Sequence, residues 1–237
     1  NTDLTALHYR HLATQVARQL QNNEALEDII WNRARAHVCS DQDVVTKGNH
    51  CSLGVSEYDF LVTSTLASQA PSAVGRALGI SLIDHLGLQE DSYNKVVDNP
   101  KETISYCSLG DGSVNNAHFL SARNLADYAE HRKFNCPVLF GISDNQLCIS
   151  LPGHKYLTST FLKTFNMEVF QADGQDLSDI VTTCSQAADY VRTNRKPATI
   201  IYKNLPRRFG HAATDRQHKY LQKSYIDGQQ ESNPLEY

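Results

Sequence analysis

The chain has 237 residues, enough for one large α/β domain with extensions and a substantial buried core. Its 22 Lys and Arg residues against 26 Asp and Glu residues give a formal net charge of −4, which argues against a nucleic-acid scaffold with a basic surface. No apolar run in the sequence approaches the ~18 residues of a membrane span. The composition therefore favours a globular protein that binds neither nucleic acid nor lipid through a spanning helix.

The six cysteines form no Cys-x-x-Cys pair, so the sequence gives little support to a zinc site or a redox motif. We expect free thiols that pack as small hydrophobic side chains in a reducing compartment. They are Cys39, Cys51, Cys107, Cys136, Cys148 and Cys184.

In the first part of the chain, periodic apolar residues predict helices separated by polar loops. An amphipathic helix is predicted over residues 8–37, and loops over residues 40–56 and 87–101. Another helix begins near Gln69, and its many small residues make it a candidate for packing against a second copy.

From residue 103 onward, strand and helix patterns alternate. Strands are predicted at 104–109, 137–143, 167–171 and 198–202, with helices at 115–132 and 176–194 between them. Such alternation predicts right-handed crossovers and a mostly parallel sheet, which is a doubly wound α/β fold flanked by helices. Ligands in these folds bind outside the carboxyl ends of the strands.

These patterns divide the chain into three parts. Residues 1–46 are expected to form a helical N-terminal arm, residues 47–205 the ligand-binding α/β domain, and residues 206–237 an active-site loop with a C-terminal tail.

Two turns at the expected carboxyl edge carry oxygen ligands. Gly110-Asp111-Gly112 follows one buried strand and Asp144-Asn145 follows the next. A carboxylate and an amide oxygen are suitable ligands for Mg²⁺, which completes its coordination with water and phosphate oxygens. Gly112 allows an anion to approach the backbone, and the following helix offers its N-terminus. Each turn alone is a common loop, but both at one edge indicate a Mg²⁺–diphosphate site.

The same motifs carry a family resemblance, over about residues 47–220. Gly110-Asp111-Gly112, a helix, an apolar strand and Asp144-Asn145 resemble the thiamine diphosphate motif, in the form found in the α subunit of 2-oxo acid dehydrogenases, with the branched-chain type most similar. Residues 63–75 resemble the segment before the first core helix of that family. Residues 207–215, Arg-Arg-Phe-Gly-His-Ala-Ala-Thr-Asp, resemble its active-site loop.

The resemblance implies a role for each matching residue. Asp111, Asn145 and the backbone carbonyl of Leu147 would ligate Mg²⁺. Contacts to thiamine diphosphate would come from Ser64, Leu66, Gly110, Asp111, Gly112, Ser113, Asn115 and Asn145. His211 would face the reactive carbon and transfer protons, and Arg208 would stabilise the loop or a phosphate. A structural K⁺ would lie near Thr63, Thr65, Ser68 and Gln69.

The chain also departs from the family in places. A Tyr-Arg pair that helps to hold the diphosphate has no good match, and Trp31-Asn32-Arg33 is a poor substitute. Ala212 and Ala213 stand where kinase-regulated members carry a serine. No residue replaces the carboxylate that the partner β chain supplies to the cofactor, so the chain should be inactive alone.

By this resemblance the protein would decarboxylate a 2-oxo acid oxidatively and pass the acyl group to a lipoyl group. Its expected partners are a β subunit, or fused β half, with the pyrimidine-binding domain, and a lipoyl-bearing acyltransferase. An α2β2 assembly in the mitochondrial matrix is expected, with the bacterial cytoplasm as the alternative. A transketolase-like enzyme and a non-catalytic structural or regulatory subunit are the alternatives for function. A generic nucleotide-binding module lacks its glycine motifs.

Overall fold

The structure is a computed structural model of the chain, and a defined set of residues is described. These are 2–43, 47–48, 58–60, 65–87, 97, 99–149, 151–153, 155–207, 209–211 and 214–231. The predicted loops at 40–56 and 87–101 lie mostly outside them.

A five-stranded sheet forms the centre of the molecule, in the order β1-β2-β3-β7-β6. All four neighbouring pairs are parallel. The strands are β1 (Leu4–Ala6), β2 (Ser105–Gly110), β3 (Val138–Ser143), β6 (Glu168–Asp173) and β7 (Ala198–Lys203). A separate antiparallel pair consists of β4 (Leu147–Cys148) and β5 (Leu151–Pro152). The predicted doubly wound, mostly parallel sheet is confirmed.

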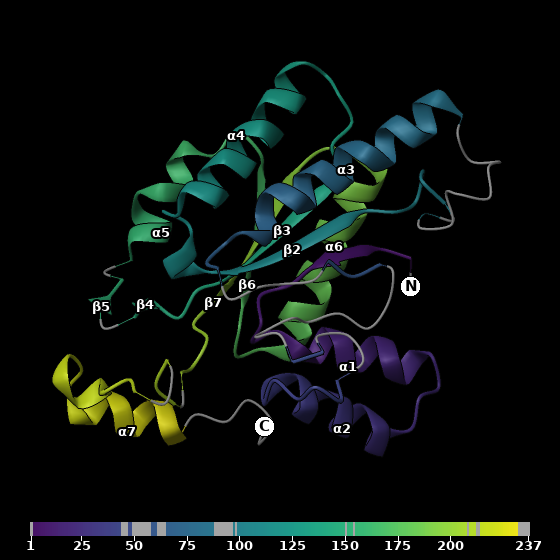
Figure 1. Cartoon of the computed structure of the whole chain (residues 1–237). Coiled ribbons are helices and arrows are strands. Elements are labelled where there is room, and N and C mark those ends of the chain that lie inside the picture. Colours follow the sequence, from purple (N-terminus) through teal and green to yellow (C-terminus); the bar gives the residue numbers. More distant parts are fainter. Residues whose placement is uncertain are drawn as a thin grey trace.

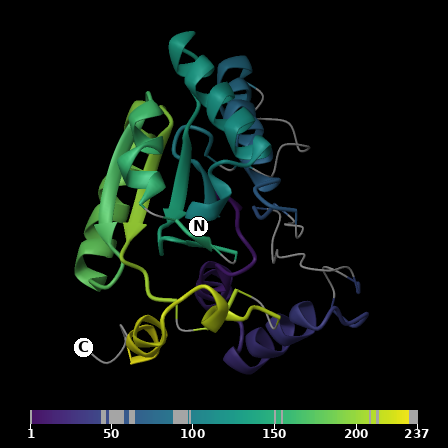
Figure 2. The same cartoon turned by 90° about the vertical axis from the view of Figure 1, so that its left-hand side faces the viewer.

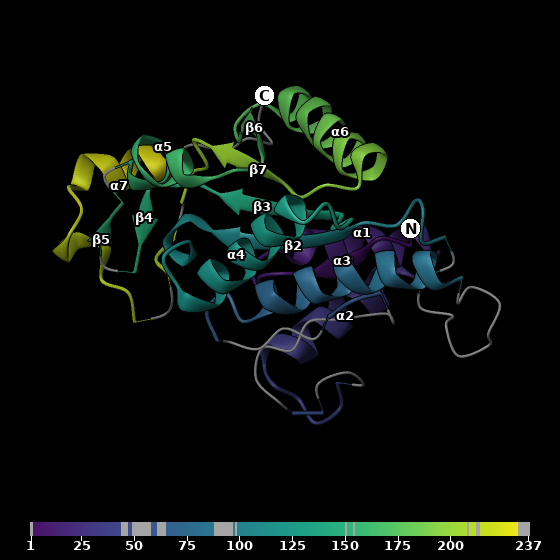
Figure 3. The same cartoon turned by 90° about the horizontal axis from the view of Figure 1, so that it is seen from above.

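Helices cover both faces of this sheet. They are α1 (Leu12–Gln21), α2 (Leu26–His37), α3 (Gln69–Leu86), α4 (Ala117–His131), α5 (Tyr156–Ser159), α6 (Leu177–Asn194) and α7 (Lys223–Glu231). Figures 1 and 3 show α3 and α4 side by side on one face and α6 on the other.

Each face has its own hydrophobic core. Small residues of α3, such as Ala73 and Ala77, and the Phe119 ring of α4 pack on Cys107 and Phe140 of the sheet. On the opposite face the buried stripe of α6 packs on apolar residues of β3 and β7. Because alanine side chains are short, α3 lies close to the sheet. The strands point toward the end of the molecule where α1, α2 and α7 gather (Figure 2).

The N-terminal region differs from the prediction in two respects. Two helices replace the single helix predicted over residues 8–37, because Asn22 ends α1 and Asn23 takes a left-handed conformation with φ of 61°. Asparagine tolerates that conformation better than most residues. Residues 4–6 also form an edge strand that was not predicted, since three residues are too few to show a period.

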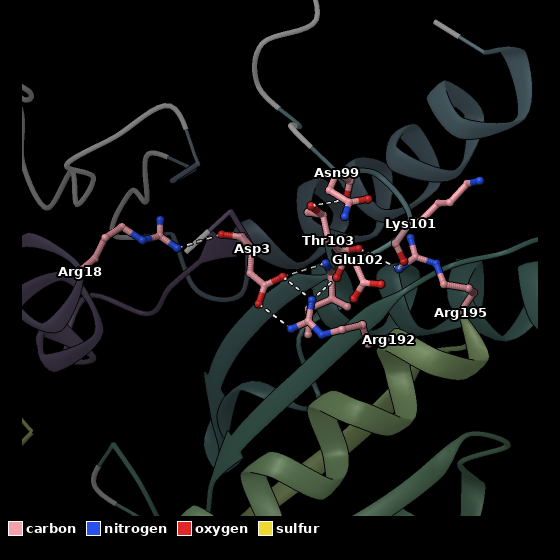
Figure 4. A network of polar contacts seen from close by, with 9 residues as sticks. Asp3, Arg18, Asn99, Lys101, Glu102, Thr103, Arg192 and Arg195 are labelled. Atoms are coloured by element: carbon pink, nitrogen blue, oxygen red, sulfur yellow. Dashed lines mark hydrogen bonds and ion pairs between the residues drawn. The ribbon is translucent and has the colours of Figure 1, made fainter. Parts of the chain in front are cut away.

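Polar contacts at the amino edge of the sheet hold β1 in place (Figure 4). Asp3 accepts a hydrogen bond from the Ile104 backbone at 3.0 Å and pairs with Arg192 of α6 at 2.8 Å. Arg18 of α1 donates to the Asp3 carbonyl at 2.8 Å. Nearby, Arg195 donates to the carbonyl oxygens of three residues, Pro100, Lys101 and Thr103. The first strand is therefore fixed from two helices and from β2.

Two further expectations concern composition. Within the described ranges, no helix has the length and apolar character needed to cross a bilayer. Five of the six cysteines lie in those ranges, and all five are free thiols as expected: Cys39, Cys107, Cys136, Cys148 and Cys184.

Candidate functional site

A cavity of about 620 Å³ lies at the carboxyl edge of the sheet. It is lined by the ends of β2 and β3, by the segment between β1 and α1, and by the segment after β7. Its lining includes Gly110, Asp111, Gly112, Ser113, Ser143, Asn145, Leu147, Cys148, Ile149 and Leu66. His8, Arg10, His11, Pro206, Arg207, Phe209, Gly210 and His211 complete it. This volume lies in the range of small-molecule and cofactor sites.

Asp111 begins a 3₁₀ turn directly after β2, and its carboxyl group is largely buried. Gly110 and Ser143, the last residues of β2 and β3, are register partners, and Asp111 and Asn145 line the same cavity. The turn after β2 therefore meets the turn after β3, as predicted for strand ends that share one edge. Burial, and then the neighbouring carboxylate of Asp144, raise the pKa of Asp111 to about 7. A cation close to this carboxyl would lower its pKa, so the raised pKa is what is expected without one.

Asn145 and Asp144 shape the second turn. The Oδ1 atom of Asn145 accepts from the Leu147 backbone at 3.0 Å, and Oδ1 of Asp144 accepts from the Gln146 backbone at 3.0 Å. An amide oxygen with one such bond keeps a second lone pair for a ligand. Asp144 is buried, and this burial raises the pKa of its carboxyl.

These groups fit a divalent cation with a diphosphate. Asp111, Asn145 and the Leu147 carbonyl are oxygen ligands of the kind that Mg²⁺ takes, and a cation would offset the repulsion between Asp111 and Asp144. Arg10 and Arg207 on the cavity wall supply positive charge for phosphate oxygens. Gly112 leaves its backbone open to an approaching anion. In the described part of the chain no cluster of three or more His, Cys, Asp or Glu side chains could hold a metal. The set of oxygen ligands named above differs from such a cluster, because it combines one carboxylate with an amide oxygen and a backbone carbonyl.

His211 lies at the opposite wall from Asp111, in the segment after β7. Arg10 donates to its carbonyl oxygen at 2.7 Å, and the same Nη2 atom lies 3.0 Å from ring atom Nδ1. Burial, and then the charges of Arg10 and Arg207, lower the pKa of His211. The ring is therefore neutral near pH 7 and has a nitrogen able to accept a proton.

Asp215 anchors the loop that carries His211. Its carboxylate accepts from the His211 backbone at 2.7 Å and from the Tyr220 hydroxyl at 2.8 Å. Arg207 donates to the same hydroxyl at 2.5 Å. These contacts order both sides of the His211 turn around one carboxylate.

The structure brings most predicted site residues together, with some exceptions. Asn115 is exposed and does not line the cavity. Ser64, Arg208 and Thr63 lie outside the described residues. Of the residues expected near K⁺, Gln69 is buried and donates from its side chain to the Ser108 carbonyl at 2.9 Å.

The segment between β1 and α1 contributes three lining residues that the sequence analysis missed: His8, Arg10 and His11. A Tyr-Arg pair does exist, at Tyr9-Arg10, and its arginine lines the cavity. Trp31-Asn32-Arg33, which the sequence analysis already rated a poor match, lies on α2 with Arg33 buried and is not among the residues that line the cavity. The signal that could have indicated this site is the Tyr9-Arg10 dipeptide itself. It lies early in the chain, after a strand of only three residues.

The fold is that of an α/β protein with a mostly parallel sheet and a cavity at the strand ends. The chain belongs to the dehydrogenase E1 component family, which matches it over residues 1–237.

Individual relatives agree with this family. The pyruvate dehydrogenase E1 component subunit alpha of Rickettsia felis is 31% identical over 144 residues, which are 58% of this chain and 41% of the relative. The mitochondrial 2-oxoisovalerate dehydrogenase subunit alpha 2 of Arabidopsis thaliana is 25% identical over 159 residues, 65% of this chain and 29% of the relative. The chain thus spans less than half the length of these relatives.

Solved transketolases share the fold. The enzyme from Leishmania mexicana superposes with a TM-score of 0.56 at 19% identity, covering 84% of this chain and 28% of the transketolase. A transketolase from Pichia stipitis gives a TM-score of 0.57 at 17% identity, with the same coverage. At such identities the likeness establishes the fold, and it confirms the expected fold class.

Proposed function

We propose that this chain is the α-type component of a thiamine diphosphate-dependent 2-oxo acid dehydrogenase, with Mg²⁺ and the cofactor diphosphate in the cavity described above. The observation that carries the proposal is the pairing of Gly110 with Ser143 at the ends of β2 and β3, directly before Asp111 and Asp144-Asn145. It unites the two predicted metal-ligand turns in a cavity that Arg10 and Arg207 make favourable for an anion. Family membership supports the same activity.

Each group in the cavity has a distinct proposed task. Asp111, Asn145 and the Leu147 carbonyl hold the cation, while Gly110, Gly112 and Ser113 present backbone and hydroxyl groups to the diphosphate. We propose that Arg10, which follows Tyr9 and lines the cavity, serves as the diphosphate-binding arginine. Ser64 and Leu66 are proposed to contact the cofactor, and Arg208 to support the loop.

Thiamine diphosphate supplies the carbanion chemistry of decarboxylation when it is bound. The chain's own contribution is to position that group and to move protons beside it. His211, neutral and hydrogen-bonded to Arg10, can accept a proton at a ring nitrogen and return it at a later step. The apolar side chains of Leu66, Ile149 and Phe209 also line the cavity and are exposed in this chain.

The substrate class follows from the resemblance. A branched-chain 2-oxo acid is our proposal, since the active-site motifs most resemble that type, and a 2-oxoisovalerate dehydrogenase subunit is among the relatives beside pyruvate dehydrogenase subunits. Acyl transfer to a lipoyl group of an acyltransferase would complete the reaction. K⁺ near Thr65, Ser68 and Gln69 is a further proposal.

We also propose the assembly and the compartment. A β-type chain with the pyrimidine-binding domain would close the cavity and supply the missing carboxylate, in an α2β2 assembly. The mitochondrial matrix is the proposed location, with the bacterial cytoplasm as the alternative, since bacterial and mitochondrial relatives both match.

One of the two alternatives keeps specific support. The transketolase fold neighbours favour another thiamine diphosphate enzyme, which would use the same metal ligands without a lipoyl acceptor. A non-catalytic subunit was favoured by the apparent lack of a Tyr-Arg pair, and the position of Arg10 in the cavity removes that argument.

The test is to prepare the chain with its β-type partner and measure binding and turnover. Calorimetry should show Mg²⁺-dependent binding of thiamine diphosphate. Decarboxylation of 2-oxoisovalerate with transfer of the acyl group to an oxidised lipoyl group, which yields an S-acyl-dihydrolipoyl product, should follow, and faster than with pyruvate. Ketol transfer without a lipoyl acceptor would favour the transketolase-like alternative. No cofactor binding in the presence of the partner would favour the structural subunit.

A further inference from the structure

The segment between β1 and α1 brings two histidines into the cavity that the proposed mechanism does not use. His8 and His11 flank Arg10, and all three line the cavity. Their rings lie near each other, with centroids 5.6 Å apart, and the His8 ring lies 4.4 Å from the Tyr9 ring. The question is whether the two imidazoles only pack, or also bind the occupant of the cavity.

The hydrogen bonds of His8 determine where its ring proton lies. The His8 backbone N–H donates to the Ser108 hydroxyl at 2.8 Å, which fixes the residue against β2. Ring atom Nδ1 accepts from the Arg10 backbone N–H at 3.3 Å. In a neutral imidazole with Nδ1 as acceptor, the proton is on Nε2. No described residue accepts from that Nε2–H group, so it is available to a ligand.

His11 acts through a neighbour. Its Nε2 atom lies 3.1 Å from the Ser143 hydroxyl, at the end of β3. Its Nδ1 atom is buried and has no hydrogen-bond partner among the described residues. If the ring proton lies on Nε2, this N–H group donates to Ser143, and only the acceptor atom Nδ1 is left without a partner among the described residues. Ser143 then accepts from His11, and its own O–H is free to point into the cavity that Ser143 lines.

We propose that His8 and His11 are binding residues for the anionic group in this cavity, His8 through its Nε2–H and His11 by orienting the Ser143 hydroxyl as a donor. For the identity of the anion, a diphosphate, this rests on the proposed function. Together the two histidines add neutral hydrogen bonds beside the charges of Arg10 and Arg207.

The charges around the segment agree with neutral rings. Burial, followed by His11, Arg10 and His211, lowers the pKa of His8 to about 3, and burial with Arg10 lowers that of His11 to about 4. The charged and titratable groups that act on these rings are Arg10 and His211, while Arg207 and Asp111 line the same cavity. Neutral donors bind phosphate oxygens without adding repulsion to this cationic wall.

Calorimetry on the full chain with its partner tests the proposal, with two probes, each with Mg²⁺: thiamine diphosphate and inorganic pyrophosphate. His8→Phe, which keeps a flat ring but no donor, should weaken both probes about tenfold or more. His8→Gln, which restores a donor, should recover most of that loss. His118→Phe, at an exposed position on α4, is the matched control and should bind like the wild type.

The role of His11 is tested by a double-mutant cycle. Ser143→Ala should weaken binding of both probes about tenfold, and His11→Phe by a similar factor. The double variant should be no weaker than Ser143→Ala alone, because His11 acts only through that hydroxyl. The Ser143→Ala substitution removes a single hydroxyl and should keep the fold even if His11→Phe does not. Thermal unfolding measures the stability of both variants.

The outcomes separate this proposal from the proposed function. Wild-type affinity in His8→Phe and Ser143→Ala would overturn the histidine proposal alone. Binding of pyrophosphate but not of thiamine diphosphate, with the expected losses in the variants, would support the histidines and overturn the thiamine function. A wild-type complex that binds neither probe would overturn both.

Discussion

Arg10 donates a hydrogen bond from its guanidinium to the carbonyl oxygen of His211 at 2.7 Å, although the two residues are 201 positions apart in the chain. The segment that carries the proposed diphosphate-binding arginine thereby contacts the loop that carries the proposed proton-transfer group. Binding and chemistry are adjacent in the cavity, yet different residues serve them, so they can be separated by mutation.

His211→Ala should leave Mg²⁺-dependent binding of thiamine diphosphate close to that of the wild type and cut turnover by ~10²-fold or more, as for a residue that transfers protons. Calorimetry and a steady-state assay on the same preparation measure the two quantities. Full turnover in this variant would show that His211 is a bystander.

Asp111→Ala should abolish Mg²⁺-dependent cofactor binding and leave the fold intact, since it removes the only carboxylate among the expected metal ligands. Titration with Mg²⁺ at fixed thiamine diphosphate measures the loss. Asp189→Ala, at an exposed position on α6, is the control. If Asp111→Ala bound with unchanged affinity, Asp111 would not belong to the site.

Tyr220→Phe should loosen the His211 loop, because the hydroxyl donates to Asp215 and accepts from Arg207. The loss of about 1 kcal/mol of local stability corresponds to roughly fivefold faster cleavage within residues 207–219 by trypsin. Tyr225→Phe, on α7, is the matched control. Equal cleavage rates in both variants would mean that the Tyr220 hydroxyl does not order the loop.

Acid should destabilise the ligand-free protein through His8 and His11. Their pKa values are about 3 and about 4 in the folded chain and near 6.5 when unfolded, so the unfolded state binds more protons between these limits. The free energy of unfolding therefore rises with pH across this window. The stability that the two neutral histidines contribute decreases as the pH falls below 6.5.

His8→Gln and His11→Gln should each flatten this dependence, since glutamine does not titrate. The measurement is the melting temperature at pH 7.5 and at pH 5, compared between each variant and the wild type so that other groups cancel. Melting curves that shift with pH as much in the variants as in the wild type would contradict the prediction.

The sequence predicts the four long strands and two long helices between residues 104 and 203 well, because each is long enough to show its period, whereas the short β4, β5 and α5 and the helix α7 in the expected tail were not predicted. The buried stripe of α6 and the apolar run of β3 are examples, and the chain order of these elements alone implies that Asp111 and Asn145 meet. The meeting of these two turns follows from a general rule of parallel sheets and needs no knowledge of individual contacts.

The first forty residues could not be predicted as well, for physical reasons. Strand β1 has three residues, and the contacts that hold it come from distant parts of the chain, such as the ion pair of Asp3 with Arg192. A pattern of neighbouring residues in the sequence cannot indicate that Asp3 pairs with a residue 189 positions away. Without β1, nothing in the sequence places Arg10 or its neighbouring histidines at the strand ends.

The contacts of Asp3 with residues far along the chain also affect how the chain folds during its synthesis. Strand β1 is synthesised among the first residues of this chain, but its hydrogen-bonding neighbour β2 emerges about a hundred residues later. The clamp from Arg192 follows only after most of α6 has left the ribosome. The first strand therefore stays without its neighbour until about a hundred further residues have been synthesised, and the contact with Arg192 forms later still.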